Sequence, residues 1–257
     1  MKITFITGAA NGLGKEFAKL YAKDGNNLLL VDIDEIALKS VKEEISKING
    51  DIFIDLFIAD LSKLEELKKV YNYTLEKDYF INNLANCAGF GDRMDFKDMD
   101  IDKQIKMTEV DCNAVLYFTR VFMDNMLKYD EGHIINVASI AAFMPAPYMC
   151  TYHACKSFVL LLGEAISYEI RKTNVKLLTL CPGPFNSKFV EIAHNDYTFK
   201  KIKPIDASDV ALFGYKKSLK GKSLAIVGFK NRLTIFATRF APRKFVTKTS
   251  AKTMKKE

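Results

Sequence analysis

The chain has 257 residues, of which 49% are hydrophobic, a size and composition that suit one large α/β domain. Its five cysteines (Cys87, Cys112, Cys150, Cys155 and Cys181) lack CxxC spacing, and with only three histidines the sequence argues against a metal site and a disulfide framework. We therefore expect a reduced, cytoplasmic protein without a signal peptide, and no apolar run reaches the ~18 residues of a spanning helix. The net charge of +7 leaves an anionic ligand, a membrane surface or nucleic acid open as partners.

The first predicted strand, residues 2–7, leads into a glycine-rich loop and a helix over residues 15–23. The residues of the loop that we expect to contact a ligand are Gly8, Asn11, Gly12, Leu13 and Gly14. Glycines at GxxxGxG spacing allow a tight turn and close backbone approach, and the following helix N-terminus offers free N–H groups. A strand, such a loop and a helix in this order predict a site for a pyrophosphate.

The second apolar run, residues 27–32, ends in Asp32. An acid at this position can accept hydrogen bonds from the ribose hydroxyls of NAD, and it would repel the extra phosphate of NADP. Two observations oppose this interpretation: Asp32 could instead cap a helix that starts near Asp34, and Lys15 could lie near a phosphate. We expect NAD as the cofactor, with NADP possible.

Apolar strands and amphipathic helices alternate over the rest of the chain. Further strands are predicted at residues 52–58, 80–84, 133–138, 175–180 and 224–227, and helices at 34–48, 63–75, 101–127, 152–170 and 207–219. This alternation predicts a Rossmann-like, doubly wound parallel sheet in a single three-layer α/β/α domain. The domain would span residues 1–228, with a substrate loop at about 186–205, and residues 229–257 would form a C-terminal extension.

The helix that starts near residue 152 carries Tyr152 and Lys156 four residues apart, so that the two side chains project from one face. A phenol beside an ammonium group can act as a general acid/base, because the cation favours the phenolate. The alternative is a surface tyrosine over a solvated lysine. Asn113, inside the predicted helix 101–127, is an unfavourable helix residue that either faces solvent or has a buried role. Ser139 follows a strand at its carboxyl end, where ligands of parallel sheets bind.

Together these motifs resemble the classical short-chain dehydrogenase/reductase family, from the N-terminus to about Gly228. The loop after the first strand resembles the family's TGxxxGxG sequence, and Asn86-Cys87-Ala88-Gly89 resembles its NNAG, with Cys87 in place of the second Asn. The resemblance adds Asp60 and Leu61 as adenine contacts and Pro182 and Gly183 beside the nicotinamide. The full expected cofactor set is Gly8, Asn11, Gly12, Leu13, Gly14, Asp32, Asp60, Leu61, Asn86, Ala88, Gly89, Tyr152, Lys156, Pro182 and Gly183.

The resemblance also implies a catalytic tetrad of Asn113, Ser139, Tyr152 and Lys156. Tyr152 would exchange a proton with the substrate oxygen while a hydride passes to or from the nicotinamide, and Ser139 would hold that oxygen. Lys156 would hold the nicotinamide ribose and favour the phenolate, and Asn113 would anchor a water that links Lys156 to solvent. The alternative function is a non-catalytic NAD(P)-binding sensor or scaffold of the same fold.

The substrate is expected to be a small carbonyl compound or alcohol of apolar character. The predicted pocket wall is rich in aromatic residues and methionine: Phe90, Met94, Phe143, Met144, Tyr148, Phe185, Phe189 and Tyr197. Loops over an α/β sheet also bury apolar residues for packing alone, so the pattern has two explanations. Because relatives pair through the helices that carry Asn113 and Tyr152, we expect a homodimer or homotetramer.

The C-terminal extension is basic and amphipathic. Its apolar residues are Phe229, Leu233, Ile235, Phe236, Phe240, Phe245 and Val246, interleaved with Arg232, Arg239, Arg243, Lys244 and Lys248. Such a segment can lie peripherally on an anionic membrane, where each Lys or Arg contributes about 1 kcal/mol, or pack over the substrate pocket or against another subunit. Pro242 is expected to break a continuous helix. No nucleic-acid-binding module is recognisable, so we expect no nucleic-acid partner.

Overall fold

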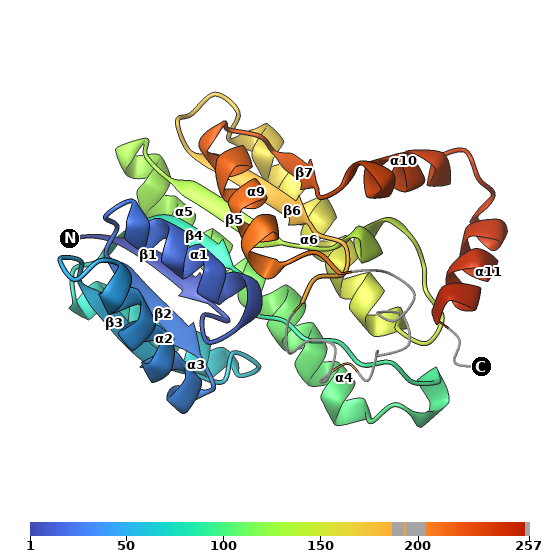
Figure 1. The fold of residues 1–257 in the computed structure, drawn as a ribbon, viewed down its shortest axis with the longest axis horizontal. Coiled ribbons are helices and arrows are strands. Elements are labelled where there is room, and N and C mark those ends of the chain that lie inside the picture. Colours follow the sequence, from blue (N-terminus) through green and yellow to red (C-terminus); the bar gives the residue numbers. More distant parts are fainter. Residues whose placement is uncertain (187–192, 194–203, 255–257) are drawn as a thin grey trace.

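The centre of the protein is a parallel sheet, seen in a computed structural model that describes residues 1–186, 193 and 204–254. Its seven strands have the order β3-β2-β1-β4-β5-β6-β7 (Figure 1). They are β1 (Lys2–Thr7), β2 (Leu28–Asp32), β3 (Ile54–Ile58), β4 (Phe80–Asn86), β5 (His133–Val137), β6 (Lys176–Cys181) and β7 (Leu224–Ile226). The order reverses at β1, between β2 and β4, which confirms the predicted doubly wound sheet and places its switch point there.

Helices cover both faces of the sheet. One face packs against α1 (Gly12–Lys23), α2 (Glu35–Ile48) and α9 (Ala207–Leu219). The other packs against α3 (Leu64–Glu76), α5 (Val115–Tyr129) and α6 (Cys150–Glu169). The remaining helices are α4 (Ile101–Thr108), α10 (Phe229–Thr238) and α11 (Arg243–Met254), with short turns η1 (Phe96–Asp98), η2 (Glu109–Ala114) and η3 (Ile140–Phe143). The predicted three-layer architecture is confirmed.

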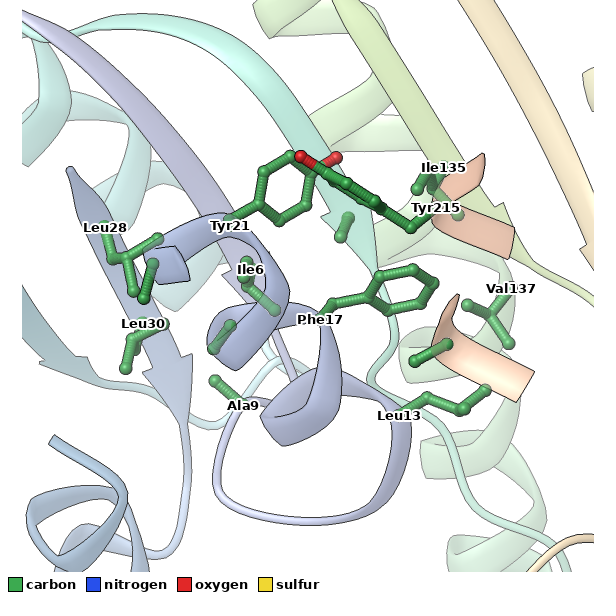
Figure 2. Packing of buried hydrophobic residues seen from close by; sticks show 14 of the residues in the cluster. Ile6, Ala9, Leu13, Phe17, Tyr21, Leu28, Leu30, Ile135, Val137 and Tyr215 are labelled. Atoms are coloured by element: carbon green, nitrogen blue, oxygen red, sulfur yellow. The ribbon is translucent and has the colours of Figure 1, made fainter. Parts of the chain in front are cut away.

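The core beneath α1 shows how side-chain spacing builds these layers. Phe17 and Tyr21 lie one helical turn apart on α1 and are almost fully buried (Figure 2). Tyr21 meets Tyr215 of α9 edge to face, with ring centroids 4.9 Å apart, and Leu28 and Leu30 of β2 close the same cluster. Alternate β2 residues, Leu29 and Val31, enter the core on the opposite face, as expected for a central strand buried on both sides.

The predicted helix 101–127 is helical throughout, but it contains one turn of π-helix. After α4 the chain makes this turn, η2, before α5 continues. A π-turn adds a residue to the helical repeat, and such turns occur often at functional sites.

At the C-terminus the predicted break at Pro242 is confirmed, since α10 and α11 are separate helices on either side of it. Among residues 1–186, 193 and 204–254, no helix combines the length and the apolar character needed to cross a membrane.

Candidate active site

A cavity of about 970 Å³ lies at the carboxyl ends of the strands. Residues directly after β1, β3, β4, β5 and β6, and the last residue of β2, line it: Gly8, Ala59, Cys87, Ala138, Pro182 and Asp32. Most predicted site residues also line it, namely Asn11, Gly12, Leu13, Asp60, Leu61, Ala88, Gly89, Ser139, Tyr152, Lys156 and Gly183. Three predicted residues, Gly14, Asn86 and Asn113, are not part of the lining.

The loop after β1 forms a cradle for a ligand. Gly8 and Gly12 have φ angles of +64° and +52°, values that glycine adopts without strain. A Cβ atom on Gly8 would lie 2.8 Å from the backbone of Ala88, so only glycine allows the two loops to approach this closely. Asn11 makes no side-chain capping bond, which leaves the first-turn N–H groups of α1 facing the cavity for an anion. These features fit a dinucleotide pyrophosphate.

Gly14 and Asn86 have structural roles instead of the predicted direct cofactor contacts. A Cβ atom on Gly14 would lie 2.2 Å from the carbonyl oxygen of Gly8, so this glycine lets α1 pack onto its own loop. The buried Asn86 side chain donates to Asn136 Oδ1 at 2.9 Å, and Thr119 Oγ1 lies 3.2 Å away. These bonds fix the ends of β4 and β5 below the cavity.

Asp32 lies at the cavity and stiffens the glycine loop. Its carboxylate accepts hydrogen bonds from the backbone N–H groups of Ala10 at 2.9 Å and Asp34 at 3.1 Å. The alternative role as a helix cap belongs to Asp34, whose carboxylate accepts from Ala37 N at the start of α2. The ammonium group of Lys15 forms an ion pair with Glu44 at 2.5 Å, so it is not free to bind a phosphate at this end of the cavity.

Asp60 and Leu61 form the neighbouring wall. The Asp60 carboxylate accepts hydrogen bonds from the Ser62 N–H at 3.1 Å and the Ser62 hydroxyl at 2.7 Å. Burial alone would raise the pKa of Asp60, but these bonds and Lys63 outweigh burial and hold that pKa below its ordinary value. Asp60 therefore presents a charged carboxylate in a fixed orientation.

Ser139, Tyr152 and Lys156 meet in the middle of the cavity wall. Lys156 Nζ lies 5.6 Å from the centroid of the Tyr152 ring and donates to the carbonyl oxygen of Val137 at 3.2 Å. The Ser139 hydroxyl accepts from Ala141 N at 3.1 Å and lies 3.5 Å from the carbonyl oxygen of Pro182. A phenol and an ammonium group from α6 and a hydroxyl at the start of η3 thus line the same wall of the cavity.

A buried acid holds Lys156 in place. The side chain of Asp111, in the π-turn η2, is fully buried, and its Oδ1 lies 2.7 Å from Lys156 Nζ. Its other oxygen accepts from Phe90 N at 3.0 Å. A Cβ atom on Gly89 would lie 2.6 Å from Asp111 Oδ1 and 3.2 Å from Lys156 Nζ, so glycine is required there to leave room for this ion pair.

Comparison with known proteins identifies the family of this chain. The family model for short chain dehydrogenase matches residues 2–197. The chain belongs to the short-chain dehydrogenase family. It is 28% identical over 217 residues to an uncharacterized oxidoreductase of Staphylococcus saprophyticus, covering 84% of this chain and 92% of that protein.

Solved structures share the fold of this short-chain dehydrogenase. One is a short-chain dehydrogenase from Sphingobium yanoikuyae in complex with NADPH, with a TM-score of 0.83 at 21% identity over 93% of this chain and 94% of that one. Another, from Burkholderia phymatum in complex with NAD, has a TM-score of 0.81 at 24% identity, covering 92% of this chain and 91% of the other.

The prediction that Asn113 occupies a buried position near Lys156 is wrong. Its side chain is exposed and donates to Glu109 Oε2 at 2.7 Å on the outer surface of η2. Asp111, two residues earlier, contacts Lys156 instead. A signal for Asp111 was present in the sequence: it lies in helical spacing with Met107, Ala114 and Phe118, all of which are buried.

The charges around Tyr152 act in opposite directions. Burial raises the pKa of Tyr152, Lys156 opposes that increase, and the carboxylate of Asp111 adds to it. Burial by itself would lower the pKa of Lys156, but Asp111 and Tyr152 outweigh burial and raise it. Burial raises the pKa of Asp111 against the effect of Lys156. Lys156 therefore remains a cation, and Asp111 weakens its effect on the phenol.

The apolar end of the cavity matches only part of the predicted substrate wall. Phe90, Met144 and Phe185 line it, whereas Met94, Phe143 and Tyr148 do not. Phe189 and Tyr197, and most of the predicted substrate loop 186–205, lie outside the described residues. The sequence prediction missed Val110 and Ile140, and it left open whether the C-terminal extension covers the pocket. Among the described residues, no group of His, Cys, Asp and Glu is arranged to hold a metal ion.

The ion pair makes Asp111 a stability determinant. Replacing Asp111 with Ala leaves the Lys156 ammonium buried without its counter-charge, so we expect the free energy of unfolding to fall by about 3 kcal/mol or more. Urea unfolding measures this change. Asn113→Ala, which removes an exposed side chain from the same π-turn, should change stability by no more than about 0.5 kcal/mol. Equal losses in the two variants would contradict the assignment.

Proposed function

We propose that the protein is an NAD(P)-dependent oxidoreductase that transfers a hydride between the nicotinamide and a carbonyl or alcohol substrate. The observation that carries this proposal is the convergence of Ser139, Tyr152 and Lys156 at the junction of two parts of one cavity. On one side lie the glycine loop, Asp32 and Asp60, which fit a dinucleotide. On the other side lie apolar side chains such as Phe90, Met144 and Phe185. A substrate oxygen at the junction would meet all three polar groups.

In this mechanism the side chains handle the proton. Tyr152 donates its phenolic proton to the carbonyl oxygen in reduction, or accepts the alcohol proton in oxidation. The Ser139 hydroxyl hydrogen-bonds the same oxygen and fixes its position, and Lys156 stabilises the phenolate electrostatically. The bound nicotinamide supplies or accepts the hydride. Asp111 acts as a positioning residue, because it holds Lys156 and moderates its charge without facing the substrate.

The lining of the substrate end favours an apolar substrate. Beside Tyr152 it contains Val110, Ile140 and Met149, and beyond them Ala241 and Val246 from the C-terminal part of the chain. We infer that the substrate is an apolar ketone, aldehyde or secondary alcohol.

Removing the Tyr152 hydroxyl tests the catalytic assignment. With NADH or NADPH and a panel of apolar ketones, aldehydes and alcohols, Tyr152→Phe should lower kcat by about 10²-fold or more, because the proton donor is lost. Cofactor binding, measured by nicotinamide fluorescence, should change little. Tyr168→Phe, on the exposed end of the same helix, is the matched control and should retain activity. Wild-type binding without turnover on the whole panel would favour a non-catalytic nucleotide sensor. Equal activity in Tyr152→Phe would show that Tyr152 is not the proton donor.

The charge of Asp111 should set the pH dependence of alcohol oxidation. Oxidation requires the Tyr152 phenolate, so kcat/KM rises with pH through the pKa of Tyr152. Because Asp111 raises that pKa, Asp111→Asn should move the rise to lower pH. Glu109→Gln, an acid-to-amide change in the same π-turn, is the control and should leave the profile in place. An unchanged or higher midpoint in Asp111→Asn would show that this charge does not affect Tyr152.

Asp32 predicts a preference for NADH. The wild-type protein should bind NADH more tightly than NADPH, since the extra phosphate would meet this carboxylate. Asp32→Asn keeps a hydrogen-bond acceptor for Ala10 but removes the charge, and we expect it to reduce the preference about fivefold or more. Asp34→Asn, which alters the adjacent helix cap and not the cavity lining, should preserve the ratio. Tighter NADPH binding by the wild type would overturn this prediction.

A further inference from the structure

The helix α10 carries two stripes of side chains, a mainly polar one that lines the cavity and an apolar one that is exposed. Ile235 is buried, and Asn231, Thr234 and Thr238 line the cavity at spacings of three and four residues. Phe229, Leu233 and Phe236, continued by Phe240, recur at the same helical spacing and are each between 56% and 76% exposed. Single exposed apolar side chains are common on protein surfaces. Three in register on α10, with Phe240 just beyond its end, form a continuous stripe, which marks an interaction surface.

The two C-terminal helices and the segment that connects them are rich in exposed positive charge. The exposed basic residues of the two helices and their connection are Lys230, Arg232, Arg239, Arg243, Lys244, Lys248 and Lys252. Lys244, Lys248 and Lys252 repeat every four residues along α11, a spacing at which like charges repel. The sequence has no Asp or Glu in residues 210–256. Within the part of the chain that the structure describes, none of these seven basic side chains forms an ion pair.

The pair of helices has a defined position on the enzyme. Asn231 Nδ2 donates to Val227 O at 2.7 Å and fixes the start of α10, and Arg93 Nε donates to Met254 O at 2.7 Å at the end of α11. Figure 1 shows the two helices, in red, extending from β7 away from the sheet. Their inner residues line the substrate end of the cavity, so the apolar stripe lies on the outside of the same wall.

Charge decides between two occupants of this surface. A second copy bound through the same face would place Arg and Lys of one copy against those of the other, which opposes association. A bilayer with anionic headgroups supplies negative charge for the basic residues and an apolar interior for the aromatic ones. We propose that α10 and α11 form a peripheral membrane-binding surface for anionic phospholipid, beside the opening of the substrate cavity. This inference does not rest on the catalytic chemistry of the site.

Vesicle co-sedimentation of the full chain tests the proposal, with neither cofactor nor substrate present. Phosphatidylcholine vesicles that contain phosphatidylglycerol should bind the protein, and vesicles of phosphatidylcholine alone should bind it much less. High salt should weaken binding, since surface charges are screened. Absence of binding to the anionic vesicles, or equal binding to both kinds at every salt concentration, would overturn the proposal.

Two matched double variants test whether vesicle binding depends on this surface or on any exposed apolar side chains. Phe236→Ser with Phe240→Ser removes two exposed rings whose centroids lie 5.2 Å apart, and should weaken partitioning into anionic vesicles about tenfold or more. Ile36→Ser with Phe53→Ser removes two exposed apolar side chains elsewhere and should leave partitioning unchanged. Circular dichroism checks the folding of both variants. Equal effects of the two pairs would overturn the proposal.

The basic residues have their own matched pair. Arg243→Gln with Lys244→Gln should weaken binding to anionic vesicles, whereas Lys42→Gln with Lys47→Gln on α2 should not, and a reversed result would contradict the proposal.

Analytical ultracentrifugation without vesicles tests whether a second copy of the chain binds this face. Dissociation of an oligomer caused by Phe236→Ser with Phe240→Ser, but not by the Ile36/Phe53 pair, would assign the face to a second copy and overturn membrane binding.

Discussion

The buried ion pair between Asp111 and Lys156 is the interaction on which the candidate site depends. Transferring a lysine ammonium from water into this wall is costly unless a counter-charge lies in contact, and Asp111 supplies it at 2.7 Å. Asp111 lies in the π-turn η2, and a glycine at position 89 leaves space for the pair. A π-helical turn therefore supplies the partner of Lys156, and such turns occur often at functional sites.

The same pair balances two requirements of the chemistry. A lysine that is free to approach the phenol would lower the pKa of Tyr152 strongly, whereas burial of the phenol raises it. Asp111 offsets part of the lysine's effect, so the protonated tyrosine is favoured in this wall. In the proposed mechanism, a protonated phenol is the form that donates a proton to a carbonyl oxygen, and the Asp111–Lys156 pair supports this form.

Much of the fold was predictable because its signals are local. Strand–helix alternation, the glycine loop and the Tyr152–Lys156 spacing each depend on a few adjacent residues. The structure confirms the sheet, and Ser139, Tyr152 and Lys156 line one cavity in it. The role of Asn113 was inferred from the family resemblance, whereas the helical spacing of the buried residues Met107, Ala114 and Phe118 includes Asp111 and leaves Asn113 outside. Gly14 and Asn86 lie within recognisable motifs, yet their contacts depend on tertiary packing that a motif does not describe.

The C-terminal extension shows how one segment can serve two surfaces. Periodicity of three and four residues appears twice on α10, once for the cavity wall and once for the exposed stripe. Covering the exposed stripe with a bilayer would also bring the apolar end of the cavity close to the hydrocarbon boundary. An apolar substrate dissolves preferentially there, and its transfer into the cavity would avoid exposure to water. Under the proposed function and the proposed membrane surface, the apolar lining inside the wall and the aromatic and basic stripe outside it would both serve an apolar substrate.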